Sequence, residues 1–212
     1  MTDLTPAILL SAYRAGVFPM SESRDDPEVF WVEPRMRGVL PLDGFHISRS
    51  LAKAISRAPF RISFDICFDA VVRGCADRDE TWINDTIFDL YGQLHAQGHA
   101  HSIEVWRDQT LVGGVYGVSI GAAFFGESMF STATNASKIG LAYLTDHLRR
   151  GGYRLFDTQF ITPHLASLGA VEITRDAYQD RLAAALLAHA DWPDAGDIPH
   201  PDQLLQRNAQ MS

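Results

Sequence analysis

The pattern of apolar and polar positions predicts a strand, a polar loop, a helix and a second strand in the second half of the chain. Residues 121–126 are expected to form the first strand, and residues 131–137 form a loop rich in Ser, Thr and Asn. Residues 136–150 repeat apolar side chains at helical spacing and end in two glycines. Residues 153–160 alternate as the second strand. The rest of the chain is organised around this segment.

Three polar side chains fall on or next to these two strands. Glu127 directly follows the first predicted strand. Asp157 and Gln159 lie two residues apart on the second strand, so we expect both to project from the same face. Aromatic residues flank all three, and an ionised acid in apolar surroundings needs a partner. A cationic substrate such as an amine would be one, although acids at strand ends more often serve caps or ion pairs.

The remaining elements are antiparallel strands and helices, an order typical of an α+β protein. Residues 101–107, 111–118 and 121–126 are expected to form a three-stranded meander. This order is similar to that of an acetyltransferase-type acyltransferase, whereas periodicity alone reaches only the class α+β. Residues 17–20 are expected to form an apolar turn, and the proline-containing tail from residue 191 an irregular segment. The other predicted helices are 5–16, 49–57, 69–76, 85–97 and 176–189, with a helical turn at 163–168, and the other predicted strands are 30–32, 37–40 and 60–64.

The composition is that of an ordinary globular protein. The 212 residues suffice for one domain and a small appendage, with 46% hydrophobic and 21% charged residues. No apolar run approaches the length of about 18 residues typical of a membrane span, and no charged-then-apolar leader opens the chain. The two cysteines, Cys67 and Cys75, indicate reduced thiols in a cytoplasmic protein and leave a disulfide open.

One row of positive side chains contrasts with the net charge of −8. Arg49, Lys53 and Arg57 are four residues apart on a predicted helix, so they stack along one face. A solvated helix face is the ordinary explanation for such a row. No acid lies between the three, however, and this favours a contact with phosphate groups. The acidic chain as a whole argues against a broadly basic nucleic-acid binder but permits a local basic patch.

Three other kinds of functional site have weaker support in the sequence. His95, His99 and His101 lack a further ligand at a recognisable metal-site spacing, and a glycine breaks the helix between the first two, so we expect packing or surface histidines. A nucleophile elbow at Ser128 needs a small residue two positions later, where the chain has Phe. An acetyl-CoA enzyme would offer a glycine-rich turn before the central helix, and residues 131–138 contain no glycine.

Several long stretches resemble one family, the leucyl/phenylalanyl-tRNA–protein transferases. They extend from about residue 10 to residue 182, and the combination of AHSIEVW, LVGGVYG and GESMFS is long and specific. The matching stretches are SAYRAGVFP, HISRSLAK, TWI, LHAQGHAHSIEVW, LVGGVYGVSIGAAFFGESMFS, NASK, DTQ and HLASLGA.

The resemblance implies a fold, an activity and a set of partners. The fold would be α+β, an acetyltransferase-like (GNAT-like) mixed sheet flanked by helices in residues 41–212, with a small N-terminal α+β domain in residues 1–40. The activity would be transfer of Leu or Phe, and sometimes Met, from aminoacyl-tRNA to the N-terminal Arg or Lys of a protein, which marks it for N-end rule degradation. The aminoacyl ester is already activated, so no cofactor, ATP or metal is implied.

The resemblance also assigns site residues. Asp157 and Gln159 are the implied catalytic pair, with Glu127 as a third essential polar residue. Gln is a very weak base, so we expect Gln159 to orient the amine and Asp157 to hold Gln159, while a substrate hydroxyl or water relays the proton. Replacing Asp157 by Ala is expected to remove most transfer activity and leave the fold intact. The implied pocket for the aminoacyl group and terminal adenosine consists of Tyr13, Met20, Trp82, Tyr91, Val115, Phe124, Leu144, Phe156 and Thr162.

Two other function classes remain open at this point. One is an acyl-CoA-dependent N-acyltransferase on the same fold, which pantetheine-dependent activity would support. The other is a non-catalytic module that binds aminoacyl-tRNA or protein N-termini, which binding without transfer would support. The pocket also departs from the family pattern, since Met20 stands where Trp is usual after Phe-Pro. The preferred amino acid is therefore left open.

The basic row yields a first prediction, because the family uses this region to contact the tRNA acceptor stem. Replacing Arg49, Lys53 and Arg57 by Ala should weaken tRNA affinity and flatten its salt dependence by about 0.7–0.9 in log–log slope per lost phosphate contact. Transfer from a short donor that carries only the terminal adenosine and amino acid should change little. Equal losses with both donors would show that the row does not contact tRNA.

Overall fold

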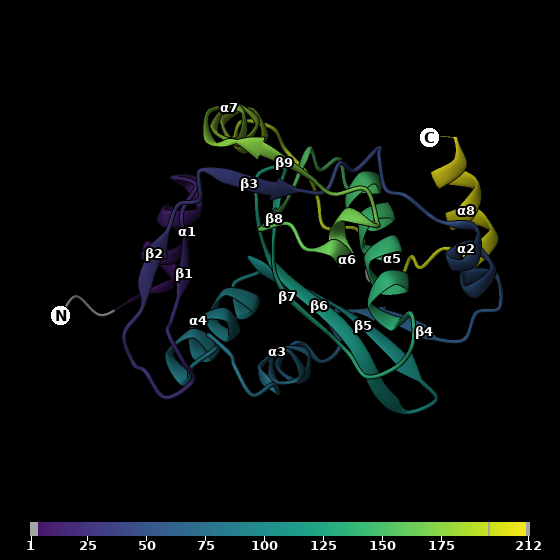
Figure 1. Cartoon of the computed structure of the whole chain (residues 1–212), viewed down its shortest axis with the longest axis horizontal. Coiled ribbons are helices and arrows are strands. Elements are labelled where there is room, and N and C mark those ends of the chain that lie inside the picture. Colours follow the sequence, from purple (N-terminus) through teal and green to yellow (C-terminus); the bar gives the residue numbers. More distant parts are fainter. Residues whose placement is uncertain (1–3, 195, 211–212) are drawn as a thin grey trace.

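The computed structural model describes residues 4–194 and 196–210, and in this part of the chain seven strands form one mixed sheet (Figure 1). The strands are β1 (Phe18–Met20), β2 (Phe30–Val32), β3 (Met36–Val39), β4 (Arg61–Phe64), β5 (Ala100–Arg107), β6 (Thr110–Ile120), β7 (Ala123–Ser131), β8 (Leu155–Gln159) and β9 (Val171–Thr174). The order across the sheet is β4-β5-β6-β7-β8-β3-β9, while β1 and β2 form a separate two-stranded sheet. Among the described residues, only the β7–β8 pair of the large sheet is parallel.

Helices cover both faces of the large sheet (Figure 1). They are α1 (Pro6–Arg14), α2 (Arg49–Ser56), α3 (Phe68–Ala76), α4 (Asp85–Ala96), α5 (Ala136–Arg150), α6 (Pro163–Ala166), α7 (Arg175–Leu186) and α8 (Pro201–Ala209). In the described residues, one hydrophobic core packs α5 and α2 against the sheet and the other packs α1, α3, α4 and α7. The predicted coarse class, a mixed α+β sheet flanked by helices, is confirmed.

In the central segment, residues 121–160, most of the observed elements match those predicted from the sequence pattern. The predicted helix at 136–150 is α5 with the same bounds, and the three-stranded antiparallel meander is β5, β6 and β7. The prediction that the first strand ends at Glu127 was wrong. The strand β7 continues to Ser131, because its second half pairs with β6 beyond a bulge at Tyr116/Gly117. Glu127 is the extra residue of this bulge: it lies within β7 between Gly126 and Ser128, which pair with Gly117 and Tyr116, and has no partner residue on β6.

Two other predictions were wrong, at residues 17–20 and in the tail. Residues 18–20 form β1, which pairs with β2 instead of turning. The tail contains α8, because His200 and Gln203 form a capping box, Pro201 occupies the first turn and Leu204 is buried. The strand β9 was not predicted at all, since its four residues are mostly exposed and show no clear alternation. Short edge elements of this kind depend on tertiary pairing more than on local pattern.

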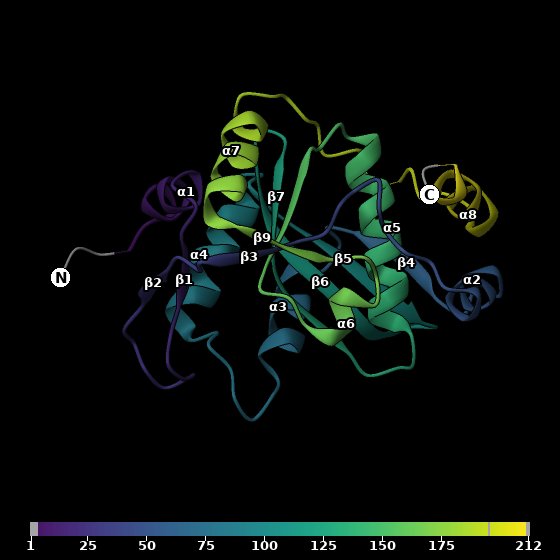
Figure 2. The same cartoon turned by 45° about the horizontal axis from the view of Figure 1, so that its top comes forward.

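The strand β3 joins the N-terminal segment to the large sheet. It lies between β8 and β9, while α1, β1 and β2 stand at one side of the molecule (Figure 2). A division of the chain at residue 40 stays a prediction, and it would give this one strand of the large sheet to the small N-terminal domain. Of the helices in the described ranges, none is long and apolar enough to cross a membrane.

Candidate active site

A cavity of about 640 Å³ opens where the carboxyl ends of β7 and β8 meet the first turn of α5 and the helix α6. Gly126 on β7 leaves room there because it has no side chain, and Phe156 on β8 forms part of the wall. Met20 and Trp82 close the cavity from the side of the N-terminal segment. The volume and mostly apolar wall suit a small organic group, with a few polar side chains to orient it.

The cavity brings together two of the three predicted catalytic residues and five of the nine predicted pocket residues. The side chains of Glu127 and Gln159 line it, whereas that of Asp157 does not. The five predicted pocket residues that line it are Met20, Trp82, Val115, Phe156 and Thr162. The four that do not are Tyr13 and Tyr91, which are buried behind Glu127, and Phe124 on β7 and Leu144 on α5, which are buried in the core between the sheet and α5.

Glu127 is the centre of a buried hydrogen-bond network. The side-chain amide of Gln159 donates from Nε2 to Glu127 Oε1 over 3.0 Å. The hydroxyl of Tyr91 donates to Glu127 Oε2 over 2.8 Å, and it is also hydrogen-bonded to the hydroxyl of Tyr13. Burial and the charge of Glu127 raise the pKa of Tyr91, so this phenol keeps its proton and remains a donor. The network fixes the carboxyl group with one edge toward the cavity.

Burial raises the pKa of Glu127 to about 7. Hydrogen bonds from Tyr13, Tyr91 and Gln159 act in the opposite direction, and the negative charge of Asp157 raises the pKa further. A carboxyl group with this pKa can gain and lose a proton near neutral pH. An ordinary surface glutamate cannot do so, because its pKa lies near 4.3.

Arg37 is the partner of Asp157 and was not foreseen from the sequence. Its Nη2 lies 2.6 Å from Asp157 Oδ2, and its Nε donates to Oδ1 over 2.9 Å, so the pair is bidentate. Both side chains are almost fully buried. The guanidinium lies between the rings of Phe18 and Tyr178, 4.5 Å from each centroid, and the hydroxyl of Tyr178 donates to Asp157 Oδ2. Burial alone would lower the pKa of Arg37, but Asp157 outweighs it and the pKa is raised.

Asp157 holds the backbone of Gln159 instead of its side chain. The backbone N–H of Gln159 donates to Asp157 Oδ1 over 2.8 Å. Gln159 has a φ of +63°, in the left-handed region that costs a non-glycine residue about 1–2 kcal/mol. The expectation that both side chains project from the same strand face stays a prediction. The two side chains have different partners, Arg37 for Asp157 and Glu127 for Gln159.

Two buried polar atoms in the cavity wall have no hydrogen-bond partner among the described residues. They are Oγ1 of Thr158 and Nε2 of His164. Burial, together with the charge of Lys138, lowers the pKa of His164, so its ring is neutral at pH 7 and each ring nitrogen is either a donor or an acceptor. Unsatisfied buried polar atoms are costly, and a ligand with hydroxyl or carbonyl groups in the cavity would satisfy both.

The other predicted candidates lie outside the cavity. Arg49 and Lys53 are exposed on α2, and Arg57 is the exposed residue that ends this helix. Of the three histidines that had been weighed as metal ligands, His95 and His101 have protein partners. The ring of His95 stacks on Phe68, and His101 is hydrogen-bonded to Asp65.

Arg78 is another residue that the sequence did not reveal, and unlike Arg37 it lines the cavity. Its guanidinium donates to Ser128 Oγ over 3.0 Å, to Met129 O over 3.3 Å and to Cys75 O over 2.8 Å. It therefore fixes the end of β7 next to Glu127. A single arginine in a polar loop gives no pattern by which this contact could be predicted, and the same holds for Arg37 in a four-residue strand.

Comparison of the fold identifies a class of relatives with a similar architecture. A solved structure of FemX has a TM-score of 0.52 and 11% sequence identity, and it covers 78% of this chain and 66% of its own. At this identity the likeness shows a common arrangement of sheet and helices.

Comparison of the sequence identifies the family. A model of leucyl/phenylalanyl-tRNA protein transferase matches residues 39–183, and a model of the N-terminal domain of the same family matches residues 2–35. The leucyl/phenylalanyl-tRNA–protein transferase of Cereibacter sphaeroides (strain ATCC 17029) is 62% identical over 99% of this chain and 98% of its own, and that of Ruegeria sp. (strain TM1040) is 63% identical over 99% of each. The chain belongs to the leucyl/phenylalanyl-tRNA–protein transferase family, and the resemblance found in the sequence is confirmed.

The buried ion pair changes the expected result of one substitution. Asp157→Ala would leave the guanidinium of Arg37 buried without a partner, so we expect a loss of about 3–5 kcal/mol in the free energy of unfolding instead of an intact fold. Asp157→Asn keeps one acceptor oxygen, for Arg37 Nε and the Gln159 N–H, and should cost less. Urea denaturation followed by circular dichroism measures both. Glu172→Ala, at an exposed acid on β9, is the control, and an equally small change in all three variants would contradict the prediction.

Proposed function

We propose that the cavity joins an aminoacyl group from tRNA to the N-terminal amine of a protein. The proposed donors carry Leu or Phe, and sometimes Met, and the proposed acceptors begin with Arg or Lys and are thereby marked for N-end rule degradation in the cytoplasm. The proposed architecture is of the acetyltransferase type. The observation that supports this function best is that Glu127 and Gln159 meet in one apolar-walled cavity of suitable volume.

The donor end fits the apolar part of the cavity. The aminoacyl side chain would contact Val115, Phe156 and Met20, because burying apolar surface stabilises the complex by about 25 cal/mol per Å². The ester and the terminal ribose would bring hydroxyl and carbonyl groups to the unpartnered atoms of Thr158 and His164. This arrangement would hold the ester carbonyl near the end of β8.

The acceptor amine fits the polar end. The Gln159 amide donates from Nε2 to the Glu127 carboxylate, and this leaves its carbonyl oxygen available to accept a hydrogen bond from the amine. Glu127 is the nearby group whose pKa of about 7 lets it take a proton from the α-ammonium. Asp157 acts as a positioning residue, since it holds the Gln159 backbone from outside the cavity.

The proposed reaction balances without a cofactor. The α-ammonium gives one proton to the Glu127 carboxylate, and the free amine attacks the ester carbonyl carbon. The peptide C–N bond forms, the bond from the carbonyl carbon to the ribose oxygen breaks, and the second amine proton passes to that oxygen, with a water or ribose hydroxyl as relay. The contribution of the protein is alignment and desolvation of two bound reactants, which can be worth about 7–11 kcal/mol of the barrier.

Transfer itself is tested by mass spectrometry. The purified protein is mixed with Leu-tRNA or Phe-tRNA and with a peptide that begins with Arg or Lys. A gain of one leucyl or phenylalanyl residue by the peptide is expected. Peptides that begin with Ala or Glu serve as controls, and no mass gain with any donor would contradict the proposed function.

The pKa of Glu127 yields a prediction on pH dependence. Because its pKa is raised to about 7, the proton-accepting carboxylate is lost as the pH falls through 7, and kcat/KM should fall with it. Without this proton acceptor the acceptor must react as the free amine, whose pKa lies near 7.7–8.0. Glu127→Gln should therefore have a lower kcat/KM, and its pH profile should keep only the change caused by titration of the acceptor amine. A pH profile identical in shape to that of the wild type would exclude Glu127 as the proton acceptor.

Val115 yields a prediction on donor choice. It is buried in the cavity wall on β6, so Val115→Phe should shrink the space for the side chain and penalise Phe more than Leu. A misfit of one methylene changes specificity by about 1–3 kcal/mol. Competition between Leu-tRNA and Phe-tRNA measures the ratio of specificity constants. Leu111→Phe, on the same strand outside the cavity, is the control. An unchanged ratio of specificity constants in Val115→Phe would contradict the placement of the donor side chain against Val115.

A further inference from the structure

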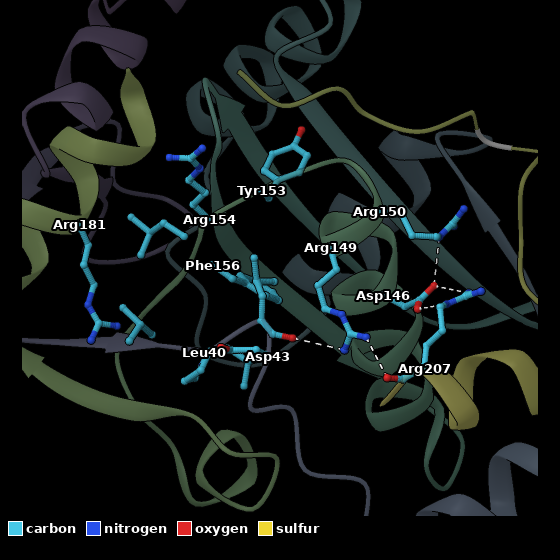
Figure 3. Close-up of a pocket in the computed structure, with 14 residues that line it drawn as sticks. Leu40, Asp43, Asp146, Arg149, Arg150, Tyr153, Arg154, Phe156, Arg181 and Arg207 are labelled. Carbon is cyan, nitrogen blue, oxygen red and sulfur yellow. Dashed lines mark hydrogen bonds and ion pairs between the residues drawn. The ribbon is translucent and has the colours of Figure 1, made fainter. Parts of the chain in front are cut away.

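A second cavity, of about 610 Å³, lies at the opposite end of α5 from the active-site cavity and is rich in arginine (Figure 3). We call it the arginine groove and define it by Arg149, Arg150, Arg154, Arg181 and Arg207. Its apolar floor includes Leu40 on one side and Phe156 on β8 on the other. No role in the family resemblance or in the proposed acyl transfer accounts for it.

Part of the positive charge in the arginine groove is structural. Asp146 on α5 is almost fully buried, and both of its oxygens accept hydrogen bonds from Arg207 at 2.7 Å. Arg150 donates to the same carboxylate over 3.1 Å and also pairs with Asp197. These ion pairs fasten α8 and the preceding loop to the end of α5, so Arg150 and Arg207 are neutralised within the fold.

The other three arginines are not neutralised. Arg149 is partly buried and donates only to backbone oxygens, to that of Leu42 over 3.5 Å and to that of Arg207 over 3.3 Å. Arg154 and Arg181 are exposed, and neither side chain has a hydrogen bond or ion pair within the described ranges. One carboxylate, Asp43, lines the groove beside these three guanidinium groups. The groove therefore presents a net positive charge on a chain whose net charge is −8.

We propose that the arginine groove binds backbone phosphate groups of the donor tRNA, apart from the end of the molecule that enters the active-site cavity. This inference rests on the proposed function, which makes an RNA the donor. Guanidinium groups suit phosphate oxygens because their donors form a planar fork. Figure 3 shows Arg181, Arg154 and Arg149 spread across the groove instead of converging on one point, an arrangement that suits successive phosphates of one chain.

The position of the groove also favours RNA over a small anion. The two cavities lie toward opposite ends of α5, which contributes Ser137 and Leu141 to one and Asp146, Arg149 and Arg150 to the other, and Phe156 on β8 lines both. The helix α8, which contributes Arg207, packs against α5 and against α2, on which the predicted basic row lies. A long polyanion can reach several of these sites at once, whereas a free phosphate can fill only one.

The test compares a double variant, Arg154→Ala/Arg181→Ala, with a matched control, Arg14→Ala/Arg35→Ala. All four side chains are exposed and without an ion pair in the part of the chain that the structure describes, so the fold should be retained in both variants. Binding of unacylated tRNA is measured over a series of salt concentrations. The groove variant should bind more weakly and lose about 0.7–0.9 of log–log salt slope per phosphate contact, while the control should match the wild type.

A second measurement separates this inference from the proposed function. With a full aminoacyl-tRNA the groove variant should have a lower kcat/KM, and with a donor reduced to the terminal adenosine and its amino acid it should equal the wild type. Absence of transfer by the wild type would contradict the proposed function, but the binding series would still decide on the groove. Unchanged tRNA binding and slope would overturn the inference. A site that takes a small anion instead of tRNA would overturn it as well. In that case inorganic phosphate would raise the melting temperature of the wild type but not of the variant, and tRNA binding would be the same in both.

Discussion

The buried ion pair between Arg37 and Asp157 is the interaction on which the rest of the site depends. Arg37 comes from β3 and Asp157 from β8, Tyr178 of α7 donates to the same carboxylate, and Arg37 Nη1 donates to the backbone oxygen of Gly16 at the end of α1. The pair thus joins the N-terminal segment to the large sheet. Burying two charges is favourable only with extensive pairing, and here Asp157 and the Gly16 carbonyl accept from Arg37, while Tyr178 and the Gln159 backbone donate to Asp157. The carboxylate so held then fixes the turn at Gln159.

Two carboxyl groups in neighbouring positions differ because their partners differ. Asp157 is held by a bidentate ion pair with Arg37 and by the hydroxyl of Tyr178. Glu127 is contacted by an amide and by phenols, which are neutral donors and offset only part of the cost of burial, so its pKa reaches about 7. The acid locked in an ion pair serves to position, and the one that titrates near neutral pH can exchange a proton with a substrate. The division of roles between the two follows from which of them Arg37 reaches.

The sequence predicted those elements whose local pattern and packing agree. The helix α5 has helical spacing of apolar residues and a Gly-Gly stop, and its bounds were predicted without error. The family and the meeting of Glu127 with Gln159 were likewise accessible. The left-handed backbone of Gln159 was not, because it is imposed by a contact with Asp157 and not by the residue type. Arg37 was missed for a related reason, since a charged residue in a short strand is ordinarily exposed and its burial depends on a partner 120 residues away.

The distribution of charge determines where a tRNA could bind to this protein. An acidic chain repels RNA over most of its surface, so a tRNA that binds must do so where positive charge is concentrated and unpaired. The active-site cavity contributes little to this attraction, because its walls are mostly apolar and its carboxyl group is negative when it is ready to accept a proton. Affinity for the donor therefore has to come from surfaces outside the cavity, and chemistry from within it. Because the arginine groove lies toward the opposite end of α5, its phosphate contacts can hold the tRNA without placing further positive charge beside Glu127, where it would lower the pKa on which the proposed proton transfer depends.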